Sequence, residues 1–283
     1  MASYRARLAK YVVLQLAGAI IIVFWLIPLY AMLVGGFKTH FEATATSVFQ
    51  LPARPTLSAY ITVWNDMKRP LINSLIVVVP VTLISGILGA MGAYFFYVLG
   101  EKHPIVSNTG FSLISLATFL PVESAFLPLY LFEYSSHMVN TYWGLMFAYL
   151  LFYIPTAALL LSIFMPVVPR YLIEAARIDE ADHWTIFWKV VFPLIVPGFI
   201  STLIFVFVMS WNNFFLPLIL TTTPSMRMVP VEERYYMGGY GTLYNETYAA
   251  AVLASIVPLA VFIALGRYFI RGLAALGGGA KGV

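Results

Sequence analysis

Residues 169–184 read PRYLIEAARIDEADHW, and this charged stretch lies between two long apolar segments. It holds four carboxylates in a chain that is only 10% charged and 61% hydrophobic. Soluble domains are about 25% charged, so this composition indicates a polytopic membrane protein. A charged island in such a chain must lie in water or against another protein, because charge is costly inside hydrocarbon.

Working outward from this stretch, the chain contains six apolar segments long enough to cross a membrane as helices. Within the third segment Pro121 predicts a kink or a helix end, because proline removes a backbone hydrogen bond. The expected fold class is an all-α polytopic membrane protein with six transmembrane helices and a charged hairpin between the fourth and fifth. The expected spans cover residues 11–34, 71–99, 107–131, 142–165, 194–220 and 248–270.

The lysines and arginines favour one orientation of these spans. If residues 1–10 and 271–283 are cytoplasmic, ten of the sixteen Lys and Arg residues lie on the cytoplasmic side. The positive-inside rule therefore predicts that both termini are cytoplasmic. The same topology places the loop at residues 166–193 in the cytoplasm.

The charged loop itself predicts two short helices, from Tyr171 to about Ile178 and from His183 to about Val191. Asp182 is suited to cap the second helix, since an aspartate side chain accepts a hydrogen bond from the first turn. Three interpretations follow from the residues alone. The loop is a solvated connection, a helix pair on the lipid surface anchored by Trp184 and Trp188, or a docking surface for another protein.

The residue order resembles a known signature. Glu-Ala-Ala-Arg-Ile-Asp-x-Ala at residues 174–181, followed by Phe192-Pro193-Leu194, is similar to the EAA motif of ABC importer permeases. Other segments resemble carbohydrate permeases of the maltose type, in particular their second permease subunit, and the resemblance covers most of the chain from Asn73 onward. These segments are Pro128-Leu129-Tyr130, NTYWGL at 140–145, Trp211-Asn212-Asn213-Phe214, Pro217-Leu218 and GAKG at 279–282.

The resemblance implies a type I ABC importer permease that forms half of the path for a sugar, oligosaccharide or polyol. It implies a bacterial plasma (inner) membrane, and the lipid bilayer is its surroundings. The implied partners are a second homologous permease, two cytoplasmic ATPase subunits and an extracytoplasmic solute-binding protein, and no nucleic acid. The segments at 35–70 and 222–246 are candidate contacts for the binding protein.

No catalysis is expected in this chain. It lacks a Gly-x4-Gly-Lys-Ser/Thr phosphate loop, so ATP and Mg are expected on the partner ATPase and no cofactor on this chain. Its four histidines are scattered, and no metal site is expected.

The resemblance also implies which loop residues contact the ATPase. The family commonly has glycine where Glu180 stands, and a side chain in a left-handed turn costs roughly 1 kcal/mol. Either the turn is not left-handed here, or Glu180 compensates through a charge contact with the partner. The implied coupling residues are Glu174, Ala175, Ala176, Arg177, Asp179, Glu180 and Ala181.

Polar side chains within spans face the bundle interior or a water-filled path by default. Asparagine amides are suited to sugar hydroxyls, and an aromatic ring is suited to stack on a pyranose face. Two alternatives stay open. The asparagine amides form hydrogen bonds between helices, and the Glu123 carboxylate accepts hydrogen bonds from backbone N–H groups freed by Pro121. The candidate residues of the solute path are Glu123, Trp211, Asn212, Asn213 and Phe214.

Three other functions stay open at this point. An ion-gradient-driven secondary transporter needs no ATPase, but the sequence has no evident internal repeat and few carboxylates within its spans. A membrane-embedded transferase needs a cluster of acid, base or metal ligands, which the sequence does not present. An ABC permease for a non-carbohydrate solute is the third alternative.

Overall fold

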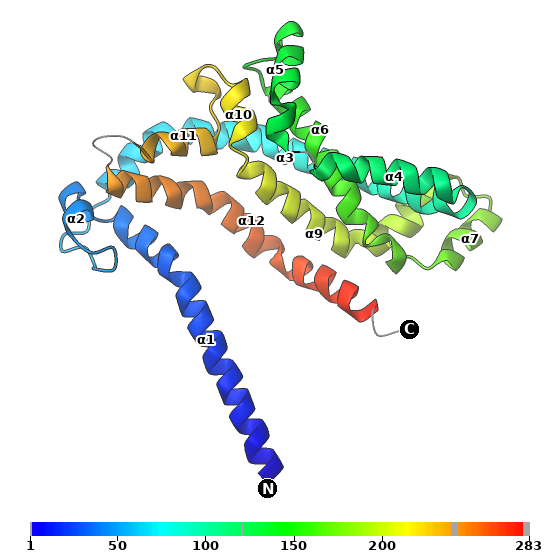
Figure 1. Cartoon of the computed structure of the whole chain (residues 1–283), viewed down its shortest axis with the longest axis horizontal. Coiled ribbons are helices and arrows are strands. Elements are labelled where there is room, and N and C mark those ends of the chain that lie inside the picture. Colours follow the sequence, from blue (N-terminus) through cyan, green and yellow to red (C-terminus); the bar gives the residue numbers. More distant parts are fainter. Residues whose placement is uncertain (1, 120, 239–242, 280–283) are drawn as a thin grey trace. The chain divides into compact units, whose positions relative to one another are not determined.

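The structure is a computed structural model that describes residues 2–119, 121–238 and 243–279 (Figure 1). Within these residues the regular structure is helical throughout, which confirms the all-α fold. Five of the described helices are long and apolar enough to cross a membrane, or six if one bent pair is a single span. Two compact units are present, which are described separately: residues up to Met67 with Glu233–Ser255, and Lys68–Glu232 with residues from Ile256 onward.

The first unit is built on α1 (Ala2–Gly36), α2 (His40–Ala45) and the ends of longer helices. The segment between α1 and α3 is ordered by a buried cation. Lys38 is 2% exposed, and its Nζ donates to the Ser47 carbonyl at 2.7 Å and to Thr46 Oγ1 at 3.1 Å. Thr39 and Glu42 form a capping box at the start of α2. The expected connecting segment is therefore a small folded element.

Helix α3 (Ser58–Lys102) runs without interruption through both Pro70 and Pro80 (Figure 1). It begins well before the expected start of the second span at residue 71. The small residues of α3 allow close helix packing, as expected. A Cβ at Gly89 would lie 2.6 Å from Ala157 Cβ on α6.

The third apolar segment is broken where Pro121 predicted it. Helix α4 (Pro104–Phe119) is followed by the 3-10 turn η1 (Val122–Ala125) and then by α5 (Phe126–Ser135). The bend between the two parts is 92°. Proline accounts for the break, because it cannot donate to the helix that precedes it.

Helix α6 (Tyr142–Ser162) leads through η2 (Met165–Val167) to the hairpin helix α7 (Arg170–Ile178). The sequence predicted a separate helix from His183 to about Val191, and this prediction is wrong in one respect. Helix α8 (His183–Ile186) does not end there but continues into the next span. A single helix runs from His183 to Trp211, through the π-helical segment η3 (Phe187–Val191) into α9 (Phe192–Trp211). Pro193 has no N–H to donate to the helix. The helix continues because the turn before Pro193 is a wider π turn, in which the Phe192 N–H bonds to the Phe187 carbonyl.

The expected fifth span is divided. Helix α9 ends at Trp211, and the short α10 (Phe215–Leu220) begins after Asn212-Asn213-Phe214. The remaining described elements are η4 (Pro224–Met226), α11 (Val229–Tyr236) and α12 (Tyr244–Gly279).

Helix α12 extends beyond the expected span end at residue 270, as far as Gly279. Residues 280–283 lie outside the described residues. They include Lys281, which entered the charge count, and most of the GAKG segment. Residues 239–242 of the 222–246 loop lie outside them as well.

Candidate coupling site and solute path

The hairpin helix α7 is strongly two-sided. Ile173 is 1% exposed and packs in a core with Ile186 and Phe187 of the following helix. The opposite face carries Glu174 and Ala175 in solvent, together with Tyr171 at 66% and Ile178 at 82% exposure. These four residues stand at i, i+3, i+4 and i+7 and therefore share one helix face.

That face combines a carboxylate, a small side chain and two large apolar side chains. Exposed apolar groups rimmed by charge are typical of protein interaction sites. The coupling residues predicted from the sequence include Glu174 and Ala175 of this surface but neither Tyr171 nor Ile178. The signal for Tyr171 was its spacing, three residues before Glu174.

The turn after α7 is left-handed at Glu180, whose φ is 56°. The Glu180 N–H bonds to the Arg177 carbonyl at 3.1 Å, and the Ala181 N–H bonds to the Ala176 carbonyl at 3.0 Å. This pair of bonds is the Schellman motif, which most often carries glycine at the left-handed position. Of the two possibilities left open by the sequence, the turn is therefore left-handed and holds a glutamate.

Asp182 caps the next helix as predicted. Its side chain accepts a hydrogen bond from the Thr185 N–H at 3.1 Å. Hydrogen bonding to Thr185 holds the pKa of the Asp182 carboxyl below its usual value. The cap fixes the start of the helix that runs on to Trp211.

The back of the hairpin is attached to the last turns of α3. Arg177 Nη1 lies 3.1 Å from Glu101 Oε2, and the Tyr97 hydroxyl donates to the Val168 carbonyl at 3.3 Å. Tyr94 Oη lies 3.1 Å from His183 Nδ1. The hairpin and the end of α3 are thus bound together by three polar contacts.

The predicted coupling residues accordingly fall into two groups. Glu174, Ala175, Asp179 and Glu180 are exposed. Ala176 and Ala181 pack against the core of their own chain, and Arg177 is engaged with Glu101. The first group is available to a partner, whereas the second shapes and holds the hairpin.

The solute-path candidates are also separated by their surroundings. Trp211 is 1% exposed and stacks on Phe207, with ring centroids 5.7 Å apart, so no ring face is open to a sugar in this conformation. Its role in stacking on a sugar stays a prediction. Packing of α9 within the bundle covers it, which the sequence alone does not reveal.

Asn213 is held within the protein. Its Nδ2 donates to the Tyr153 hydroxyl at 3.3 Å, and its Oδ1 accepts from the Leu216 N–H at 3.1 Å. The amide thus joins α6 to the start of α10, as the interhelical alternative anticipated.

Asn212 and Phe214 remain more accessible, and Glu123 is exposed on η1. The Asn212 Nδ2 donates to the Val208 carbonyl at 2.9 Å. Since η1 and α5 both pack against α10, the fold brings the segment of Glu123 near the segment of residues 212–214. Their role in the path stays a prediction.

Sequence analysis placed Glu133 in a loop, but it lies in α5 and is fully buried. Neither carboxylate oxygen has a hydrogen-bond partner in the described part of the chain. The side chain lies against the first turn of α6, where Thr141 caps the helix by accepting from the Gly144 N–H at 3.0 Å. The positive end of the α6 dipole favours a carboxylate there.

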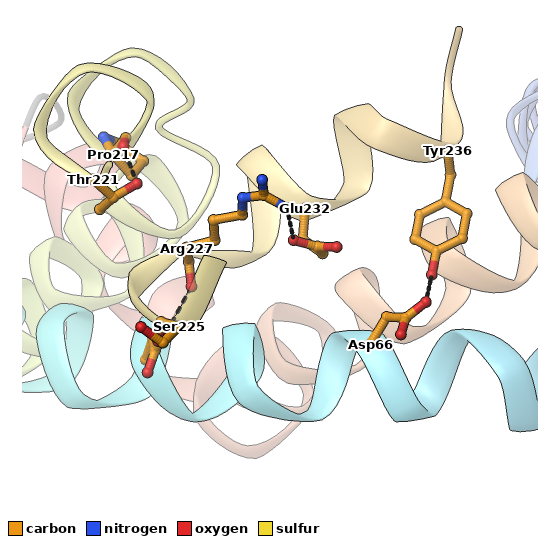
Figure 2. Close-up of polar contacts among 8 residues, drawn as sticks. Asp66, Pro217, Thr221, Ser225, Arg227, Glu232 and Tyr236 are labelled. Carbon is orange, nitrogen blue, oxygen red and sulfur yellow. Dashed lines mark hydrogen bonds and ion pairs between the residues drawn. The ribbon is translucent and has the colours of Figure 1, made fainter. Parts of the chain in front are cut away.

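The segment before α11 is fastened to the other end of α3, within the second unit. Asn73 Nδ2 donates to the carbonyls of Ser225 and Arg227 at 2.8 Å each, and the Val229 N–H donates to Ser74 Oγ at 2.9 Å. Figure 2 shows the Arg227 guanidinium against the Glu232 carboxylate, at 3.2 Å. In the first unit Tyr236 donates to Asp66 at 2.7 Å, also drawn in Figure 2.

Comparison with known proteins agrees with this arrangement. The chain is 55% identical to the glucose import system permease protein GlcU of Saccharolobus solfataricus, over 95% of both chains. It is 29% identical to the sulfoquinovosyl glycerol transport system permease protein SmoH of Agrobacterium fabrum, over 94% of this chain and 93% of that one.

Among solved structures, a bacterial ABC transporter involved in the import of the acidic polysaccharide alginate has a chain that shares the fold. The TM-score is 0.67 at 17% identity, over 91% of this chain and 96% of that chain. The family described as "Binding-protein-dependent transport system inner membrane component" matches residues 13–275. The chain therefore belongs to this family of ABC transporter permeases, which are transport components rather than enzymes.

Proposed function

We propose that this chain is one of two permease subunits of an ATP-driven importer for a neutral sugar, with a glucose-type monosaccharide as the first candidate. The observation that carries the proposal is the 55% identity to a permease named for glucose import, extending over 95% of both chains. The more distant relative named for sulfoquinovosyl glycerol keeps the broader class at sugars and their glycosides.

The proposed importer contains a second homologous permease, two ATPase subunits and an extracytoplasmic solute-binding protein. ATP and Mg bind to the ATPases in this scheme. The excess of Lys and Arg on one side of the spans supports placing both termini and the hairpin in the cytoplasm. ATPase closure moves the hairpin, the spans rock, and the path opens alternately to each side of the membrane.

The exposed face of α7 is the proposed contact with the ATPase. It offers Glu174 for a charge-assisted hydrogen bond and Tyr171 and Ile178 as apolar anchors, with Ala175 allowing close approach between them. The Schellman turn and the cap at Asp182 hold this face in a fixed geometry.

Coupling is tested by charge reversal on the exposed face. Glu174→Lys is expected to abolish co-purification of the ATPase encoded beside this chain, together with ATP-dependent uptake. Lys189→Glu is the control, because Lys189 is exposed but lies outside α7. Intact ATPase binding and uptake in Glu174→Lys would overturn the proposed contact.

The substrate is tested on the solute-binding protein encoded beside this chain, by calorimetry with glucose, an oligosaccharide, a polyol and an amino acid. Binding of glucose is the expected result. Binding of the amino acid alone would remove the sugar assignment and leave the ABC permease family unaffected.

A further inference from the structure

A cleft of about 660 Å³ opens between the last turns of α3 and the start of α8, all within the second unit. Its floor consists of buried side chains, Tyr94 and Phe187 among them. Its walls include Phe95 and Trp184, which are 57% and 58% exposed. The cleft is thus lined mainly by aromatic and aliphatic groups, yet it opens to the outside.

Side chains with basic groups are also part of the lining of this cleft: Lys102, His103, Arg177 and His183. Asp182 is the acid in the lining, and its side chain is engaged by the Thr185 N–H. Arg177 is paired with Glu101. The side chains of Lys102 and His103 make no hydrogen bond or ion pair with the described residues. The Lys102 ammonium is therefore a lining cation without an acid partner among the described residues.

The cleft also lies where two apolar spans end. Helix α3 terminates at Lys102, and the long helix to Trp211 begins at His183. Residues at this level of a membrane protein meet the lipid headgroups, where exposed tryptophan is favoured. On α3 the apolar lining extends from this level back to Met91.

We propose that this cleft binds one anionic phospholipid. Its phosphate accepts hydrogen bonds from Lys102 and His103, and an acyl chain lies along Phe95, Trp184 and Met91. The Lys102 ammonium, which has no acid partner among the described residues, favours an anion, and the apolar lining favours a lipid over a soluble phosphate. Because the cleft lies between α3 and the hairpin, the bound lipid contacts both of them. The proposal does not depend on the transported solute.

The full chain is placed in phosphatidylcholine nanodiscs that contain a small fraction of brominated phosphatidylglycerol. Quenching of Trp184 is obtained as the difference between the wild-type chain and Trp184→Phe. Brominated phosphatidylglycerol is expected to quench Trp184 more than brominated phosphatidylcholine at the same fraction. Lys102→Gln is expected to weaken the phosphatidylglycerol effect about fivefold, as is usual for one cation near a membrane surface.

Lys189→Gln is the matched control, since Lys189 is an exposed cation on the helix that carries Trp184 but does not line the cleft. It should leave the quenching unchanged. A second reporter, Phe95→Trp in the wild-type chain, probes the opposite wall without the Trp184→Phe substitution.

Equal quenching by the two brominated lipids would overturn the proposal. An equal loss of quenching by brominated phosphatidylglycerol in Lys102→Gln and Lys189→Gln would also overturn it. Displacement of the lipid by excess glycerol phosphate would show a soluble-anion site instead, and quenching of neither reporter would show that no lipid enters the cleft.

Discussion

Glu180 occupies a backbone conformation that suits glycine, with φ 56° at the end of α7. Glu180→Gly is expected to raise the free energy of unfolding by about 1 kcal/mol, because glycine has no Cβ to clash in this region. Thermal unfolding of the purified chain in detergent measures the change. Glu180→Ala is the control: it removes the carboxylate but keeps the Cβ, so an equal gain in both variants would assign the effect to charge.

Gly144 is a position where no side chain fits. A Cβ there would lie 2.7 Å from Glu133 Oε2 and closer still to the Met138 carbonyl. Gly144→Ala is therefore expected to destabilise the fold by about 1–3 kcal/mol through overpacking. The matched control is Gly92→Ala, since a Cβ at that helical glycine meets only Ala158 Cβ, at 3.8 Å. Comparable unfolding temperatures for the two variants would contradict the clash.

Asp182, Glu180 and Trp211 differ in how well their structural roles can be predicted from the sequence. The Asp182 cap was predictable because an acceptor directly before an apolar helix is a local pattern. The left-handed turn at Glu180 was left open, since only the observed φ distinguishes the two possibilities. The burial of Trp211 was not predictable, because it depends on side chains distant in sequence.

At the scale of an element, the hairpin depends on its caps. Hydrogen bonding to Thr185 lowers the pKa of Asp182 in the folded state relative to the unfolded chain. The cap therefore stabilises the start of the helix above the unfolded pKa of about 4, and this stabilisation is lost as pH falls through the lower folded pKa.

The expected result is that hydrogen exchange of the Thr185 amide, corrected for intrinsic pH dependence, becomes faster below about pH 4. Asp182→Asn keeps an acceptor without a titrating group, so its protection should not vary in this range. A wild-type protection factor that stays flat with pH would count against the role of the carboxylate.

The helix boundaries also show how far proline positions in the sequence predict where helices end. Pro121 ends a helix, whereas Pro70, Pro80 and Pro155 lie inside helices. Packed neighbouring helices can satisfy the backbone groups that proline frees, so proline alone does not fix a boundary in a membrane protein. The continuity from His183 to Trp211 was missed for this reason, because Pro193 was taken to follow a helix end.

At the scale of the whole molecule, the fold class and the family were predictable from apolar length and from one charged motif. The arrangement of the contacts along α3 was not, because those contacts join residues far apart in the sequence. Between Lys68 and Lys102 this helix holds the 225–229 segment near one end, through Asn73 and Ser74, and the coupling hairpin at the other, through Tyr94, Tyr97 and Glu101.

A continuous helix fastened at both ends is suited to transmit movement between the hairpin and the 225–229 segment, which belongs to a proposed binding-protein contact. Ser74→Ala leaves the buried Val229 N–H without its acceptor and should loosen that segment by about 1–3 kcal/mol. In the assembled importer, stimulation of ATP hydrolysis by the binding protein is expected to fall while basal hydrolysis persists. Ser115→Ala is the control, since that hydroxyl bonds only within its own helix, to the Phe111 carbonyl at 2.8 Å. If Ser74→Ala and Ser115→Ala respond alike to the binding protein, α3 does not carry the signal through this contact.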